Sequence, residues 1–133
     1  MMQLVPMLLL AATTAHLHSQ KGPVGDWANP SKSVVMNIAD CKGHLCGTVV
    51  WASEKAKRDA SKGTKHLVGS HLLTNVKETS HNHWKGKIFV PDQNMRVTAK
   101  LAMVSHDQLK VSGCALMICK SQVWHRTHQH AHS

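Results

Sequence analysis

Apolar residues recur along this chain with the period of two that is typical of β-strands. Within residues 95–104, MRVTAKLAMV, they occupy every second position from Val97 to Met103. Alternation of this kind places the apolar side chains on one face of a strand and the polar ones on the other. Residues 109–114, LKVSGC, alternate in the same way. Both segments are therefore predicted to be half-buried strands.

Shorter β-prone runs, each bounded by turn-forming residues, predict the other strands. Residues 33–39 and 45–51 flank the polar turn 40–44 and are expected to form a hairpin. The turn signal Pro91-Asp92 ends another candidate strand. Further strands are expected at residues 67–74, 83–90 and 123–127.

Two segments between these strands are almost wholly polar. Residues 53–66, SEKAKRDASKGTKH, are long enough for one helical turn but have no apolar face to bury. We expect them to form a solvated loop. Residues 75–82 are polar as well and are not expected to form a strand.

Seven or eight short strands without a substantial helix predict an all-β fold. Neighbouring strands joined by tight turns are antiparallel. An open sheet of this size would expose two edges, and closure into a small up-and-down barrel removes them. The 133 residues suffice for one such domain. A barrel of eight strands is just wide enough to hold one small ligand.

The N-terminus predicts export. The apolar stretch 4–12 is too short to span a bilayer and has the length of a signal-peptide core, although no Lys or Arg precedes it. The alternative is a buried first strand or helix. We expect a signal peptide at residues 1–19, a barrel domain at 20–127, and a periplasmic or secreted protein. No later segment has the composition of a transmembrane helix.

The four cysteines form two pairs of equal spacing, C-x-x-x-x-C. An exported protein meets an oxidising compartment, and four cysteines allow three pairings. Hairpin-length spacing favours two local disulfides, Cys41–Cys46 and Cys114–Cys119, over the two long-range alternatives. A zinc site remains an alternative, but zinc knuckles and redox pairs favour the tighter C-x-x-C spacing.

The chain is basic, with a formal charge of +9 from 16 Lys and Arg against 7 Asp and Glu. The basic residues are spread along the chain and form no long run. With one Phe and no Tyr, the chain lacks an aromatic platform for stacking bases. A basic exported protein is therefore expected, and nucleic-acid binding is not.

Twelve histidines include two groups with spacing suitable for a metal ion. These are His81 with His83, and the set His128, His130 and His132. In a strand, residues two apart point the same way and can share an ion. The alternative is a solvated, disordered tail at residues 128–133, and no cofactor is expected.

No motif predicts catalysis. The chain contains no G-x-S-x-G, no H-E-x-x-H and no glycine-rich phosphate loop. We expect a protein that is not an enzyme.

Large apolar side chains in the predicted strands are candidates to line a ligand cavity: Met36, Trp51, Trp84, Phe89 and Met103. The alternative is that they are plain core, because the interior of a small barrel is either packed or hollow.

Two further features connect the ends of the barrel. Gly25-x-Trp27 precedes the first predicted strand, and Trp124-x-Arg126 lies in the last. First and last strands are neighbours in a closed barrel, so the Arg126 guanidinium can lie across the Trp27 indole. This arrangement resembles that of the lipocalins and wider calycins.

Longer motifs resemble a small exported bacterial family labelled domain of unknown function 2147. They are GDWANPSKSVVMNIADCKGHLCGTVVW, WKGKIFVPD and LKVSGCALMICKSQVWHR, and the resemblance covers roughly residues 22–127. Two departures occur: Gln93-Asn94 replace a turn glycine, and the Lys- and Ser-rich segment 53–66 replaces an acidic loop. Asn94 tolerates a positive φ, so the turn is expected to persist.

The resemblance implies a lipocalin-like barrel that binds a small hydrophobic molecule, with no catalytic residues. Two alternatives stay open: an envelope module that interacts through its basic outer surface, and a histidine-based metal-binding protein. The oligomeric state does not follow from the sequence.

Overall fold

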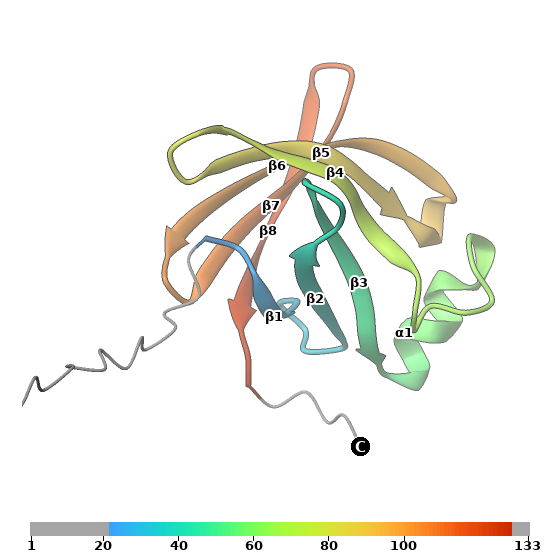
Figure 1. The fold of residues 1–133 in the computed structure, drawn as a ribbon. Coiled ribbons are helices and arrows are strands. Elements are labelled where there is room, and N and C mark those ends of the chain that lie inside the picture. The colour runs from blue at the N-terminus through green and yellow to red at the C-terminus, as the bar shows by residue number, and fades with distance from the viewer. Residues whose placement is uncertain (1–21, 129–133) are drawn as a thin grey trace, which may run out of the picture.

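The apolar alternation continues through eight antiparallel strands that close into a barrel (Figure 1). In the computed structural model, which describes residues 22–128, each strand pairs with its neighbours in sequence and the last pairs with the first. The strands are β1 (Gly25–Ala28), β2 (Val34–Asp40), β3 (Leu45–Ala52), β4 (His71–Ser80), β5 (His83–Val90), β6 (Met95–Ser105), β7 (Gln108–Ala115) and β8 (Ile118–Arg126). The predicted all-β barrel is confirmed.

Two strands extend beyond their predicted limits. β4 begins at His71 and continues through the polar residues 75–80, which were expected to lie outside a strand. There the backbone pairs with β5, as in Lys77 opposite Lys85. β8 begins at Ile118 and not at residue 123. Apart from the buried Val76, the residues of both extra segments are solvent-exposed, so backbone pairing forms these segments with little apolar alternation.

The segment 53–66 is not the loop that was expected. It contains the helix α1 (Glu54–Asp59) and the 3₁₀ turn η1 (Ala60–Lys62). Ser53 caps α1 by accepting a hydrogen bond from the Ala56 N–H at 3.0 Å. Exposed pairs from Lys55 to Asp59 and from Lys57 to Glu54 add local support. A capped helix of this length needs no broad apolar face. No helix among the described residues has the length and apolar character needed to cross a membrane.

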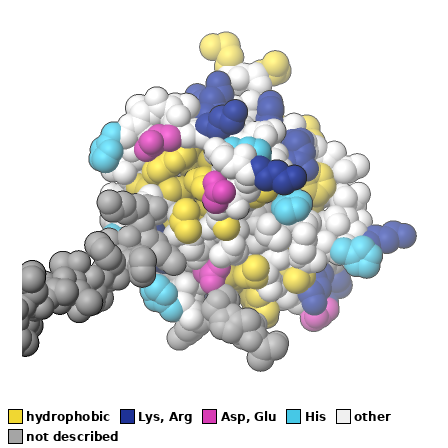
Figure 2. Space-filling model, viewed as in Figure 1, with side chains coloured by type: hydrophobic (Ala, Val, Ile, Leu, Met, Phe, Trp, Pro, Cys, Tyr) yellow, Lys and Arg dark blue, Asp and Glu magenta, His cyan; other side chains and the backbone are white. Residues whose placement is uncertain are grey.

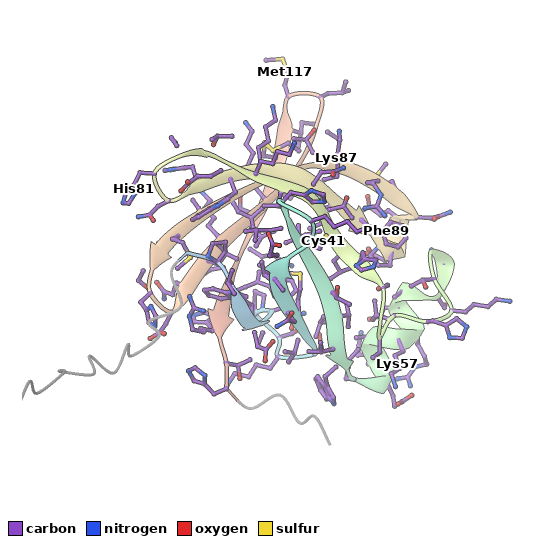
Figure 3. All side chains as sticks on the ribbon, viewed as in Figure 1. Cys41, Lys57, His81, Lys87, Phe89 and Met117 are labelled. Atoms are coloured by element: carbon purple, nitrogen blue, oxygen red, sulfur yellow. A yellow bond between two sulfur atoms is a disulfide. The ribbon has the colours of Figure 1, made fainter. Side chains whose placement is uncertain are left out.

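Both predicted disulfides are present. Cys114 and Cys119 lie directly opposite each other on β7 and β8, with their Cα atoms 4.1 Å apart. Cys41 lies just beyond β2 and reaches Cys46 on β3 across a Cα separation of 5.6 Å. Each bond therefore closes one hairpin (Cys41 is labelled in Figure 3).

The two ends of the barrel differ in packing. The floor carries the β2–β3, β4–β5 and β6–β7 turns, and the mouth carries the β1–β2, β5–β6 and β7–β8 turns with α1. The largest fully buried side chains are Trp27, Met36, Ile38, Leu73, Leu101, Leu109, Val49 and Val76. None of them lines the hollow at the mouth described below. The barrel is therefore packed towards its floor and open towards its mouth.

Candidate ligand-binding cavity

A cavity of about 790 Å³ opens at the mouth of the barrel. Its walls are mainly apolar and include Ile88, Val97, Val111 and Trp124 from the inward sides of β5 to β8, with Phe89 at the side where η1 packs. The set of lining residues also contains polar side chains, among them Asp59, Asp92, Lys120 and Gln122. Such a site suits a mostly apolar molecule that also carries a polar group.

The cavity exists because the inward side chains of β7 become smaller towards the mouth. From the floor upwards they are Leu109, Val111, Gly113 and Ala115. A Cβ at Gly113 would lie 3.3 Å from Cγ2 of Val97, so even an alanine there would crowd the wall. On β8 the corresponding row runs from the buried Trp124 to the exposed Gln122 and Lys120. The taper leaves space where a uniform row of leucines would fill it.

Short-range contacts hold the rim in place. The Asn29 Oδ1 accepts hydrogen bonds from the N–H groups of Ser33 at 2.8 Å and Val34 at 3.0 Å, which fixes the β1–β2 turn. The turn η2 (Pro91–Gln93) ends at Asn94, which has φ 47° as its sequence predicts. These contacts keep the entrance open in a defined shape.

The turn η1 packs closely on η2 at one side of the entrance. A Cβ added to Gly63 would collide with the Pro91 carbonyl oxygen and would lie 3.0 Å from the Phe89 ring. The Arg96 guanidinium lies 5.3 Å from the centroid of the same ring (Phe89 is labelled in Figure 3). Glycine at position 63 is therefore what lets the helical segment approach the cavity wall.

Four of the five predicted lining residues fall into three groups. Phe89 lines the mouth cavity. Trp84 lines a separate hollow of about 510 Å³ at the floor, near Gly22. Met36 is buried against Gly47 in the packed part, and Met103 packs against the core without reaching the cavity. The sequence thus predicted one of the five at the mouth, because alternation identifies inward residues but not their height in the barrel.

Trp51 was wrongly assigned to the interior, since it is 38% exposed on the outside of β3. The cause is an irregularity in the β2–β3 pairing between Val35 and Met36. It places Val50 and Trp51 on the outside together, while Val49 and Ala52 are buried. Strict alternation cannot anticipate such a bulge.

Trp124 is a large lining residue that sequence reasoning missed. Of the four tryptophans it alone lines the mouth cavity, and it is 6% exposed. Its Nε1 has no hydrogen-bond partner among the described residues. The decreasing size of the inward residues of β7, opposite Trp124, was the signal that could have located the cavity.

The floor is closed by the pair that the sequence suggested. The Arg126 guanidinium lies 4.3 Å from the Trp27 ring centroid. It also donates hydrogen bonds to the carbonyls of Val24 at 2.7 Å, Gly22 at 3.0 Å and His106 at 2.9 Å. Burial lowers the pKa of Arg126, and the nearby Asp107 carboxylate raises it. A guanidinium remains charged near neutral pH, so the stack is permanent there.

The structure does not assemble the predicted histidine pair into a metal site. His81 lies in the β4–β5 turn, not in a strand, and its carbonyl is 2.8 Å from the Nδ1 of His83. His128 is exposed, and His130 and His132 lie outside the described residues. Within residues 22–128, one group of potential ligands does converge, Cys41, His44 and Cys46. Its two sulfurs are bonded to each other and offer no thiolate.

An eight-stranded antiparallel barrel, closed at its floor by a Trp–Arg stack, defines a lipocalin-like protein. The chain belongs to the bacterial family described as "Uncharacterized protein conserved in bacteria (DUF2147)", whose profile matches residues 25–126. The predicted family is thereby confirmed. The predicted signal peptide at residues 1–19 lies outside the described residues.

The fold is similar to a solved structure titled "Protein HP1028 from the human pathogen Helicobacter pylori belongs to the lipocalin family". The TM-score is 0.62 at 14% sequence identity, and the match covers 80% of this chain and 83% of the other. Identity this low shows a shared fold and nothing more specific. No curated protein sequence matches the chain significantly.

Proposed function

We propose that this protein is exported and binds a small hydrophobic molecule in the mouth cavity, without catalysis. The observation that carries the proposal is the cavity of about 790 Å³, with mainly apolar walls, at the mouth of the barrel. Ligand pockets typically measure about 300–1,000 Å³ and are largely apolar. The polar lining residues leave room for a polar head group, so a fatty acid, a long-chain alcohol or a similar amphiphile fits the chemistry.

The proposed location is the periplasm or the exterior of a bacterial cell. Two observations support it: the family is bacterial, and all four cysteines are in disulfides. Disulfides persist in oxidising compartments.

Binding can be followed through Trp124, because its indole lines the cavity. We expect a long-chain alcohol to change the tryptophan emission of the wild-type protein and of Trp51→Phe. The change should be much smaller in Trp124→Phe. A full response in that variant would place the probe elsewhere.

The substitution Gly113→Leu should block binding, because its side chain would enter the space between Val97 and Ile88. Crowding of this kind costs about 1–3 kcal/mol of stability, which a folded barrel can tolerate. Lys110→Leu adds a leucine to the outer face of the same strand and serves as the control. We expect calorimetric titration to detect the alcohol with the control and not with Gly113→Leu. Equal affinity in the two variants would reject the cavity as the binding site.

Comparing a charged with an uncharged probe shows whether the probe binds in the cavity or on the basic surface. A fatty acid and the alcohol of equal chain length should both bind, and added salt should leave the alcohol's affinity unchanged. If the acid alone binds, and salt abolishes that binding, the probe is held by surface lysines and the proposed function fails.

A further inference from the structure

The β7–β8 hairpin projects beyond the barrel wall and ends in an apolar tip (Figure 1). The apolar tip consists of Leu116, Met117 and Ile118, which are 101%, 98% and 68% exposed. Met117 lies at the extreme end of the molecule in Figure 3. Single exposed apolar residues are ordinary, but three consecutive ones on a projection form a candidate contact surface.

A disulfide lies directly behind the tip, and the residues of its turn are not those that the turn geometry favours. Ala115 pairs with Ile118, which leaves a two-residue turn of Leu116 and Met117. Leu116 has φ 58°, a conformation usually taken by Gly, Asn or Asp. The Cys114–Cys119 disulfide fastens the pair immediately behind the turn. The fold therefore presents large apolar side chains to solvent where small polar ones would suit the backbone better.

Lysines cover the outer face of the strands behind this tip. Lys87 is opposite Thr98, which is opposite Cys114, so Lys87 shares a row with the disulfide. In the next row, Lys77 faces Lys85, Lys85 faces Lys100, and Lys100 faces Ser112. We call Lys77, Lys85, Lys87 and Lys100 the lysine ladder. Figure 2 shows Lys and Arg side chains gathered directly beneath the apolar tip.

The charges of the lysine ladder are not neutralised by neighbouring carboxylates. The ion pairs within residues 22–128 involve Lys55, Lys57 and His106 and no residue of the ladder. Like charges directly opposite each other across a sheet destabilise it. All four lysines are exposed, so an external anionic surface can reach them.

We propose that the apolar tip and the lysine ladder together dock this protein on an anionic lipid bilayer. The tip would enter the acyl boundary while the lysines contact anionic head groups, the two contributions that make interfacial binding stable. A second copy of the chain fits less well, because docking two such faces would oppose the ladders of two molecules with a formal charge of +9 each.

Docking would bring the mouth of the barrel to the lipid surface. Leu116, Ile118 and Lys120 belong to the cavity lining as well as to the hairpin. A ligand could then pass between the bilayer and the cavity, a step that rests on the proposed function. Docking itself does not depend on a ligand.

The first test replaces the tip with residues that its turn prefers. Leu116→Gly with Met117→Asn places glycine at the position of the turn that has a positive φ, which should preserve or improve folding. The control is Val104→Asn, which removes a residue 58% exposed near the floor. We expect wild type and control to float with vesicles of phosphatidylethanolamine and phosphatidylglycerol. The tip variant should bind at least about tenfold more weakly, because it loses two inserted side chains.

The second test removes charge. Lys87→Gln and Lys100→Gln together should weaken binding by about fivefold per lysine and flatten its dependence on salt. Lys42→Asn is the control, because Lys42 lies in the floor turn at φ 61°, which Asn tolerates. Vesicles of phosphatidylcholine alone should retain little of the wild-type protein.

Three results would overturn the proposal. One is a wild-type protein that does not float with anionic vesicles, and another is a tip variant that floats equally well. The third is equal binding to phosphatidylcholine, which would exclude a role for the ladder. If sedimentation finds a wild-type dimer that the tip variant dissociates, while neither floats, the tip contacts a second copy. Loss of alcohol binding in Gly113→Leu with vesicle docking intact would keep the two proposals distinguishable.

Discussion

Arg126 connects three parts of the chain at the floor of the barrel. Its guanidinium covers the Trp27 indole, and its N–H groups reach carbonyls before β1 and in the β6–β7 turn. The indole is itself fixed, because Trp27 Nε1 donates to the Pro23 carbonyl at 2.8 Å. One planar cation thereby donates to three backbone carbonyls and stacks on an indole at the same time.

Removing the two partners should therefore be non-additive. We expect Trp27→Ala to lower the free energy of unfolding by about 3–5 kcal/mol, through loss of a fully buried ring. Arg126→Ala should lower it by about 2 kcal/mol, through the lost stack and hydrogen bonds. Urea denaturation of both variants and of the double variant should give a coupling energy of about 1 kcal/mol. Additive losses would show that the two side chains stabilise the floor independently.

Among the elements, the short turn η1 has the most direct influence on the cavity. Gly63, at the end of η1, packs against Pro91 and Phe89. Both of these residues belong to the cavity wall. The helical segment 54–62 was not anticipated from its polar sequence, yet it forms one side of the entrance. A shift in the position of η1 should therefore change the affinity of the cavity for a ligand.

Gly63→Ala provides the test. The added methyl group would collide with the Pro91 carbonyl, so η1 should move away from η2 at a cost of about 1–3 kcal/mol. Alcohol affinity should fall in parallel. The control Gly69→Ala is strained by its φ of 94° but has nothing within 4 Å of the new methyl. It should lose stability while keeping affinity, and an affinity loss in the control alone would contradict this account of the entrance.

How far the sequence predicts an element depends on what forms that element. The limits of β5 agree with the expected 83–90, and those of β6 with the expected 95–104 to within one residue. These strands have one buried and one solvated face, which produces the alternation. Residues 77–80 and 118–122 are exposed and form strands through backbone pairing, so their side chains carry no such pattern.

The site is less predictable than the fold, because local alternation does not show where along the barrel a residue lies. Phe89 was identified because it is a large residue in a clear strand. The cavity depends on small residues, Gly113 and Ala115, and on the height of Trp124 in the barrel. Height follows from strand register around the whole ring, which local periodicity does not contain.

For the whole molecule, closure of the barrel depends on a short seam. β1 and β8 pair only at Trp27 with Arg126 and at Ala28 with His125. β5 and β6 pair over eight consecutive positions. The Thr127 N–H adds a hydrogen bond of 2.9 Å to the Asp26 carbonyl just beyond the seam. Closure is thus maintained by few backbone pairs together with the Arg126 stack.

Amide hydrogen exchange should show that the β1–β8 seam opens more easily than the pairing between β5 and β6. We expect the amide of Thr127, which donates across the seam to Asp26, to exchange through local opening, well before those of Leu101 and its neighbours in β6. Arg126→Ala should accelerate exchange at the seam more than in β6. Uniform acceleration throughout the barrel would mean that the seam opens only when the entire protein unfolds.

The local disulfides have a consequence for the oxidative folding of the chain. Each joins cysteines five positions apart, so both native bonds close shorter loops than either long-range alternative. Loop-closure entropy favours the shortest loops even before the barrel forms. Oxidation of the unfolded chain is therefore biased towards the native bonds, with little need for an isomerase to reshuffle mispaired thiols. The compartment in which this protein folds thus needs to supply only an oxidant.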